Sequence, residues 1–162
     1  ANEDANLEEA VVCNAKIGVA LHDAAIGCWN SKYYYNIERP ESYIKRVIDP
    51  TFEPNLFNPL SGEGGISPSF PAYPSGHSTF GAASAEVIAR IFGYSYSITD
   101  NCHKNRTEFS GYPRTFNSFY EMANEIAWSR VPLGVHFRMD AEEGMRYGTE
   151  IGRIVNRLPW KK

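Results

Sequence analysis

The chain has 162 residues, of which 43% are apolar and 14% aromatic, and its formal net charge at pH 7 is −3. A chain of this length can bury one sizeable core, so a single globular domain over residues 1–162 is expected. The acidic balance, without a run of lysines and arginines, argues against nucleic acid and anionic membrane surfaces as partners. No stretch approaches the roughly 18 apolar residues of a membrane span. The sequence thus predicts a soluble chain and leaves its compartment open.

The three cysteines, Cys13, Cys28 and Cys102, form no CxxC pair. Neither a zinc site nor a disulfide framework is therefore indicated. Cys13 and Cys28 lie on one predicted helix, about 22 Å apart at the helical rise, which is beyond the reach of a disulfide. Both are expected to be buried thiols.

A first helix is predicted over residues 7–31. Apolar or small residues recur there with a helical period, at Leu7, Val11, Ala15, Val19, Ile26 and Trp29. Other faces of this helix are also apolar, so it is expected to be mostly buried. His22 falls on the same stripe, which favours a hydrogen-bonded core histidine over a ligand.

The middle of the chain is predicted to be a long loop followed by a second helix. Seven of the ten prolines lie between Pro40 and Pro74, together with the run SGEGGIS, so only one short helix, near Glu41–Val47, is expected there. The second long helix is predicted from Ser78 to Phe92, with Gly93 as its stop signal. The polar connection at residues 94–116 shows no strand alternation.

Two further helices complete the predicted architecture. Ser118 and Glu121 have the spacing of a capping box, which opens a helix leading to Ser129-Arg130. Breaks at residues 132 and 134 end it, and a last helix is predicted from His136 to about Leu158. The chain is therefore predicted to be an all-α helical bundle.

The stretch Pro74-Ser75-Gly76-His77 stands directly before the second long helix. The first N–H groups of a helix have no intrahelical partner and carry positive potential, so they favour an anion. Ser75 adds a hydroxyl and His77 a titratable ring. Taken alone, the four residues also fit an ordinary N-cap in which Ser75 caps the helix and His77 is exposed.

His136 and Asp140 are one helical turn apart at the head of an apolar stripe formed by Gly144, Tyr147, Ile151, Val155 and Leu158. A carboxylate in that position can accept the ring Nδ1–H, which leaves Nε2 pointing outward as a nucleophile or ligand. Taken alone, a structural pair that satisfies itself at a helix start fits equally.

Three cations accompany these two motifs. Lys32 and Arg39 are seven residues apart with Pro40 following, and Arg130 precedes His136 by six residues. Singly, each could lie at the surface and pair with a carboxylate. Together they suit a tetrahedral oxyanion with several negative charges. The remaining donors and imidazoles of that set are Ser75, Gly76, His77 and His136.

These pieces match three signatures in order and spacing: KX6RP at Lys32–Pro40, PSGH at Pro74–His77 and SRX5HX3D at Ser129–Asp140. The chain thus resembles vanadium-dependent haloperoxidases and the type-2 phosphatidic-acid-phosphatase-like (PAP2) acid phosphatases over residues 5–156. The runs HDAAIGCWNSKYYYNIERP and SFPAYPSGHSTFGAA resemble the chloroperoxidase-like branch. Such haloperoxidases are usually much longer, so the resemblance implies the C-terminal half of a larger bundle, whose partner would be a missing N-terminal half or a second copy.

The resemblance also implies a role for each motif residue. His136 would bond the vanadium of vanadate axially, or become a phosphohistidine in a phosphatase. His77 would act as acid and base on the opposite oxygen, Asp140 would orient His136, and Lys32 would also polarise peroxide. Phe70, seven residues before His77, stands where halide preference is partly set, although it also fits a loop anchor packed on the core. The equatorial oxygens would be held by Lys32, Arg39, Ser75, Gly76 and Arg130.

The implied activity is oxidation of a halide by hydrogen peroxide to hypohalous acid, with vanadate as cofactor and no divalent metal. Two alternatives stay open: a metal-independent acid phosphatase that uses a phosphohistidine on a phosphate monoester, and a non-catalytic oxyanion-binding module. The residues do not choose between them, because vanadate and phosphate are both tetrahedral and both can accept an apical ligand.

Overall fold

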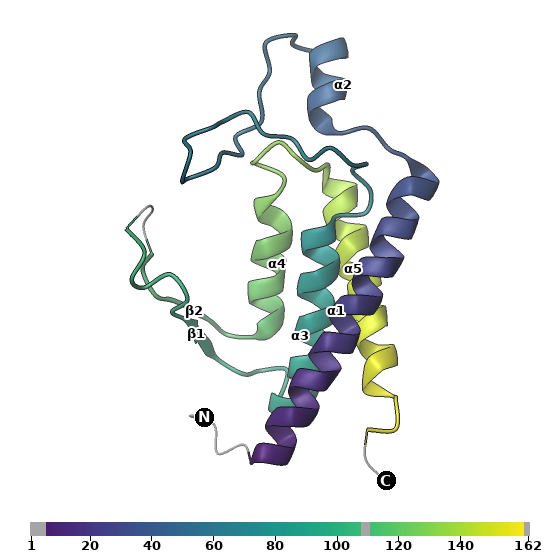
Figure 1. The fold of residues 1–162 in the computed structure, drawn as a ribbon, viewed down its shortest axis with the longest axis vertical. Helices are drawn as coiled ribbons and strands as arrows, with labels where there is room; N and C mark the ends of the chain where they lie inside the picture. The colour runs from purple at the N-terminus through teal and green to yellow at the C-terminus, as the bar shows by residue number, and fades with distance from the viewer. Residues whose placement is uncertain (1–5, 108–110, 161–162) are drawn as a thin grey trace.

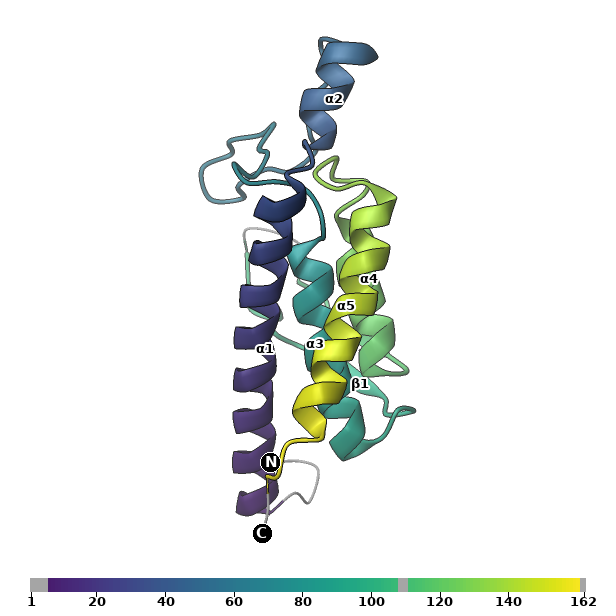
Figure 2. The same ribbon diagram turned by 90° about the vertical axis from the view of Figure 1, so that its right-hand side faces the viewer.

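The computed structural model describes residues 6–107 and 111–160, which form a helical bundle with a small hairpin. Four helices run alongside one another, and the short α2 lies beyond the end of the bundle that is remote from the termini (Figures 1 and 2). The all-α prediction is confirmed. The elements are α1 (Leu7–Tyr35), α2 (Pro40–Val47), α3 (Gly76–Phe92), β1 (Ile98–Asp100), β2 (Arg114–Phe116), α4 (Phe119–Ser129) and α5 (Arg138–Asn156).

Helix α1 begins in a capping box at Asn6, whose side chain accepts from the Glu9 N–H while the Glu9 carboxylate accepts from the Asn6 N–H. The helix ends at Tyr35 rather than at residue 31. The next residue, Asn36, terminates it in the left-handed conformation, with a φ of 48°. Lys32 therefore lies on the last turn of α1.

The buried face of α1 differs from the predicted one. Its buried residues are Cys13, Ala20, Ala24, Cys28 and Lys32, whereas Leu7, Val11 and Ile26 are 81%, 57% and 58% exposed. The prediction of a core histidine at position 22 is wrong, because the His22 side chain is 73% exposed and lies near Asp23. The small residues of α1 face the bundle because they allow close helix packing, which a count of bulky apolar residues does not detect.

The region Leu7–Val47 contains an 18-residue window of mean hydropathy 1.3, of which 22% is buried. By length and composition alone it could cross a membrane, contrary to the sequence expectation. Core helices of soluble proteins also pass that test. The expected absence of a span is thus not supported by composition.

Helices α3 and α5 approach each other closely along three glycines spaced four residues apart. A Cβ atom on Gly144 would lie 2.7 Å from the Ser75 carbonyl oxygen, and one on Gly148 would lie 2.1 Å from the Thr79 carbonyl oxygen. A Cβ on Gly152 would lie 2.8 Å from the Ala83 carbonyl oxygen. No side chain fits at these positions, so glycine sets the spacing of the two helices.

Two apolar clusters hold the remaining helices against this pair. The first joins α1, α3 and α5 through Ala20, Ala24, Ala83, Val87, Ile151 and Val155. The second joins α3 to α4 through Ala85, Ala89, Phe119 and Ala123. Helix α3 therefore lies at the centre, with α1 and α4 packed on opposite sides of it.

The connection between α3 and α4 contains a hairpin that the sequence analysis did not predict. Strands β1 and β2 pair antiparallel, with Ile98 opposite the buried Phe116 and Asp100 opposite Arg114. Each strand has three residues, too few to show a period of two. Residues 108–110 lie outside the described part of the chain.

Several predicted helix ends shift by a few residues. Helix α3 begins at Gly76 with Ser75 as N-cap, and Gly93 ends it with φ 109°. Helix α5 begins at Arg138 rather than at His136, because Phe137 is extended, and it ends at Asn156. Ser118 caps α4, but Glu121 bonds back to the Asn117 N–H, so the predicted capping box is half formed.

The surroundings of two helical glycines, Gly148 and Gly18, predict that replacement by alanine changes the stability of the chain in opposite directions. Gly148→Ala should lower the free energy of unfolding by about 1–3 kcal/mol, because its Cβ would overlap the Thr79 carbonyl. Gly18→Ala is the matched control: nothing lies within 4 Å of the added Cβ, so better helix propensity should raise stability by about 0.5–1 kcal/mol. Urea denaturation measures both. An unchanged or higher stability of Gly148→Ala would contradict the close contact.

Candidate oxyanion site

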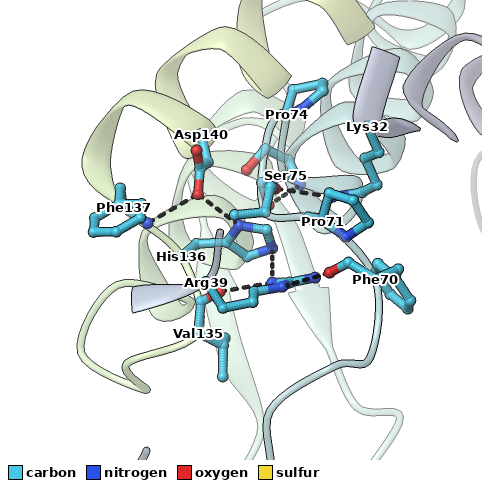
Figure 3. A network of polar contacts seen from close by, with 12 residues as sticks. Lys32, Arg39, Phe70, Pro71, Pro74, Ser75, Val135, His136, Phe137 and Asp140 are labelled. Atoms are coloured by element: carbon cyan, nitrogen blue, oxygen red, sulfur yellow. Dashed lines mark hydrogen bonds and ion pairs between the residues drawn. The ribbon is translucent and has the colours of Figure 1, made fainter. Parts of the chain in front are cut away.

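The predicted site residues meet at one end of the bundle, where the ends of five helices come together. Lys32 is on the last turn of α1, Arg39 precedes α2, Ser75 caps α3, Arg130 caps α4, and His136 precedes α5. Figure 3 shows Arg39 and His136 facing each other, with Asp140 behind the ring. The set of Lys32, Arg39, Ser75, Gly76, His77, Arg130, His136 and Asp140 is called the oxyanion cage below.

His136 and Asp140 form the expected pair. The ring Nδ1 lies 3.0 Å from Asp140 Oδ2, which also accepts from the Phe137 N–H at 2.9 Å. His136 Nε2 lies 3.1 Å from Arg39 Nη1. A guanidinium can only donate, so Nε2 is the acceptor and Nδ1 carries the proton. The Nε2 lone pair therefore faces the cationic side of the cage.

Burial decides the protonation of His136. The residue is 5% exposed and Asp140 is 0% exposed. Desolvation lowers the pKa of His136 to about 4, although the hydrogen bond to Asp140 acts in the opposite direction. The ring is accordingly neutral near pH 7, and its Nε2 lone pair can reach a ligand once the hydrogen bond from Arg39 opens.

Arg39 is held rigidly by backbone carbonyls. Its Nε donates to the Phe70 carbonyl at 2.8 Å and its Nη1 to the Val135 carbonyl at 2.6 Å. Its Nη2 is buried and has no hydrogen-bond partner within the described residues. Burial lowers the pKa of Arg39 to about 10, so the group stays charged near pH 7.

Arg130 shares this situation. It is 9% exposed, and its Nε is buried without a partner in the described part of the chain. Burial lowers its pKa as well. Neither Arg130 nor Arg39 pairs with a carboxylate of residues 6–107 or 111–160. A buried charge left without a counter-charge is costly. The unpartnered Arg39 Nη2 and Arg130 Nε are therefore suited to an anion.

The start of α3 supplies neutral donors beside these cations. Ser75 is fully buried; its Oγ accepts from the Ser78 N–H at 3.4 Å, and its own N–H donates to the Asp140 carbonyl at 2.9 Å. The cap predicted for Ser75 is therefore present. The Gly76 and His77 amides belong to the first turn, where no intrahelical carbonyl precedes them. The pKa of the exposed His77 is lowered, mainly by partial desolvation and to a smaller extent by the positive charge of Arg130.

Lys32 is fully buried, and two of its three N–H groups already have partners. Its Nζ donates to the Pro71 and Ala72 carbonyls, both at 2.9 Å. The Trp29 and Phe70 ring centroids lie 5.7 and 5.4 Å from the same nitrogen. Desolvation lowers the pKa of Lys32 to about 8. One N–H remains for a ligand.

A cavity of about 620 Å³ opens beside the cage. Among the predicted site residues, its lining includes Arg39, Phe70, Gly76, His77, Arg130 and His136. Lys32, Ser75 and Asp140 do not line it. Asp140 contacts the lining group His136, and Lys32 contacts the carbonyls of Pro71 and Ala72 in the loop that follows Phe70 (Figure 3).

Sequence reasoning missed how the loop before α3 and the adjoining turn of α1 build the cage. The carbonyls of Phe70, Pro71 and Ala72 orient Arg39 and Lys32. The Phe70 ring lies 5.2 Å from the Trp29 ring, which fits the loop-anchor interpretation; its effect on halide preference stays a prediction. The aromatic and proline run SFPAYP was the one sequence feature that could have indicated this role of the loop. The described residues contain no group of three His, Cys, Asp or Glu side chains that could hold a metal ion.

Comparison with known proteins agrees with this geometry. The family model of the VCPO (vanadium chloroperoxidase) second helical-bundle domain matches residues 13–159. A vanadium chloroperoxidase of Curvularia inaequalis is 29% identical, over 87% of this chain and 30% of its own length. A vanadium-dependent bromoperoxidase of Ascophyllum nodosum is 27% identical, over 83% of this chain and 27% of its own length.

Solved structures show the same bundle. A bacterial vanadium-dependent iodoperoxidase superposes with a TM-score of 0.80 at 34% identity, covering 91% of this chain and 33% of that protein. A holo-type bacterial chloroperoxidase superposes with a TM-score of 0.68 at 17% identity, which shows the fold alone. The chain spans about a third of the length of these relatives. It belongs to the family of the second helical-bundle domain of vanadium chloroperoxidases.

Proposed function

We propose that the oxyanion cage binds vanadate and that the chain carries the catalytic centre of a vanadium-dependent haloperoxidase, which oxidises a halide with hydrogen peroxide to hypohalous acid. The observation that carries the proposal is the pair of buried, unpartnered N–H groups, Arg39 Nη2 and Arg130 Nε, beside the neutral His136 ring. The vanadium haloperoxidases among the relatives support the same chemistry.

The residues present fit a tetrahedral oxyanion. Three cations, Lys32, Arg39 and Arg130, outnumber the one carboxylate of the cage, Asp140, so the site favours an anion with more than one charge. His136 presents a lone pair rather than a proton, which suits a bond to an electrophilic central atom. Bound vanadate would supply a Lewis acid that activates peroxide toward halide.

Each residue of the cage then has a separate task. His136 holds the central atom through Nε2, and Asp140 fixes the ring by accepting the Nδ1–H. Arg39, Arg130 and the amides at the start of α3 hold the oxygens, and Lys32 adds its remaining N–H. His77, on the first turn of α3, moves the proton that the reaction consumes, since halide, peroxide and one proton give hypohalous acid and water.

The cage would hold phosphate by the same contacts, so binding alone does not separate a haloperoxidase from an acid phosphatase. Two assays do: oxidation of halide by peroxide after vanadate loading, and hydrolysis of an aryl phosphate without vanadate. The haloperoxidase proposal expects the first and not the second. Hydrolysis alone, through a phosphohistidine, would replace it with the phosphatase alternative.

Vanadate and phosphate should each bind at a single site without a divalent metal. Isothermal titration in the presence of a metal chelator measures this binding. Arg39→Ala should weaken it strongly because a buried, charge-assisted donor is lost, whereas Arg138→Ala, an exposed arginine paired with Glu142, should leave it unchanged. A folded chain that gives no heat with either anion contradicts the proposal.

Alanine at the two cage histidines should have different consequences. His136→Ala should abolish vanadate binding, because the bond to the central atom is lost. His77→Ala should retain binding through the cations but lose about 10²- to 10⁴-fold in turnover, the usual contribution of a positioned acid or base. The exposed His22 provides the control, and His22→Ala should change neither. Loss of binding at position 77 with retention at 136 would reverse the two roles.

Asp140→Ala tests the orienting role of the carboxylate. Removing a group that orients a ligand typically weakens ligation about 10- to 100-fold, so vanadate affinity should fall by that amount while the bundle stays folded. Asp23→Ala, at an exposed position on α1, is the control. Unchanged affinity together with a collapsed melting temperature would assign Asp140 a structural role instead.

A further inference from the structure

The three methionines of the chain, Met122, Met139 and Met145, lie in different surroundings. Met122, on α4, lines the cavity beside the cage. Met139 is 46% exposed and lies outside that cavity. Met145, on α5, packs against the second apolar cluster. Exposure to solvent and access to the cage therefore rank the three thioethers in different orders.

Met122 lies on the same face of α4 as one of the cage cations. Met122, Ile126 and Arg130 follow one another at four-residue steps, so they share one side of the helix. All three line the cavity, as His77 and His136 do. The step of eight residues from Met122 to Arg130 corresponds to about 12 Å along a helix. An oxidant formed at the cage would thus reach this thioether without leaving the cavity.

The side chain of Met122 is the most readily oxidised one in the lining. Its thioether sulfur is nucleophilic at every pH, and methionine sulfoxide is a common product of oxidants that take two electrons. Trp29 also lines the cavity, but its ring packs against Phe70 and Phe80, with centroids 5.2 and 6.0 Å away. Among residues 6–107 and 111–160, no cysteine or tyrosine lines this cavity.

We propose that Met122 is the first methionine that the chain oxidises during its own turnover, by reaction of the thioether with hypohalous acid formed at the cage. This inference rests on the proposed haloperoxidase function. It gives the chain a site of self-modification, with methionine sulfoxide as the product.

The modification balances without a further oxidant. The sulfur lone pair bonds to the halogen of hypohalous acid, and the bond between halogen and oxygen breaks to release hydroxide. Water then attacks the sulfur, and halide leaves with the electron pair of the sulfur–halogen bond. Of the two protons lost by that water, one neutralises the hydroxide. The sulfur is oxidised by two electrons, the halogen is reduced, and one proton and one halide ion are released.

The sulfoxide changes the lining where it forms. Its oxygen is a hydrogen-bond acceptor, whereas Phe119, Ala123 and Ile126, the other α4 residues before Arg130 that line the cavity, have no side-chain donor. A polar group placed among them loses hydration without gaining a partner. Because Arg130 caps α4, a shift of this helix that hydrates the sulfoxide also moves a cage cation. The modification should therefore shorten the working life of the chain.

Peptide mapping by mass spectrometry tests the order of oxidation. The vanadate-loaded 162-residue chain is given halide and a limiting amount of peroxide, and the gain of one oxygen atom is followed at each methionine. Met122 should be oxidised at least about tenfold faster than Met139, although Met139 is the more exposed of the two. Hypohalous acid added from solution to the vanadate-free chain should instead oxidise Met139 at least as fast as Met122.

The outcomes separate this inference from the proposed function. Oxidation of Met139 before Met122 during turnover would show that the oxidant reacts only after release, and would overturn the proposal. Equal oxidation of Met122 when halide is omitted would overturn it too, because peroxide alone would then be the oxidant. Halide oxidation with Met122 unmodified overturns this inference alone. A folded, vanadate-loaded chain that oxidises no halide overturns the haloperoxidase function and the modification together.

Two substitutions at each of two methionines test the consequence of the modification. Met122→Leu should keep the parent's initial rate and lose activity at least about threefold more slowly, because the reactive sulfur is absent; Met139→Leu should lose activity as the parent does. Met122→Gln, which places a permanent polar group in the lining, should melt at a lower temperature than Met122→Leu. Met139→Gln and Met139→Leu should melt alike. Equal rates of inactivation in Met122→Leu and the parent would contradict a limit on turnover set at this residue.

Discussion

The close contact between α3 and α5 positions the cage. Gly144, Gly148 and Gly152 leave no room for a Cβ against the α3 carbonyls or the side chain of Glu86, and the Ser75 N–H bonds to the Asp140 carbonyl at the head of the same contact. The donors at the start of α3 are therefore held against the His136–Asp140 pair. A wider spacing would separate those donors from His136, whatever the other residues of the cage were.

A second constraint is electrostatic. The cage buries three cations around one carboxylate, with Lys32 at 0%, Arg39 at 6% and Arg130 at 9% exposed. Backbone carbonyls solvate Lys32 and part of Arg39, but the partnerless N–H groups remain a cost to the folded chain. An anion that meets those groups recovers this cost. Binding should thus depend on helix positions that the glycine contact has already set, and the Arg39–His136 hydrogen bond is the contact that has to open.

Fixed spacings at helix ends predicted part of the cage geometry, whereas the role of these residues in holding an oxyanion stays a prediction. The four-residue step from His136 to Asp140 predicted the pair, and Ser75 before a helical period predicted the cap. The buried face of α1 and the exposure of His22 could not be predicted in this way. Periodicity records where bulky apolar residues recur, whereas the bundle buries Ala20 and Ala24 because small residues permit close packing. The carbonyl partners of Lys32 and Arg39 depend on the path of a loop, which no residue type specifies.

Asp140 orients its histidine without making it a cation. The Asp140 carboxylate, 3.0 Å from Nδ1, acts to raise the pKa of His136. Burial and the nearby charges of Arg39 and Lys32 outweigh it, so that the pKa is lowered to about 4. An imidazolium would point a proton at the centre of the cage and could not bond to the central atom of an oxyanion. Desolvation therefore preserves the lone pair, the carboxylate directs it, and the surrounding cations favour an anion beside it. If the carboxylate alone set the charge of the ring, the same His–Asp pair would favour a protonated histidine, so the burial of the pair at the head of α5 makes it suitable for ligation.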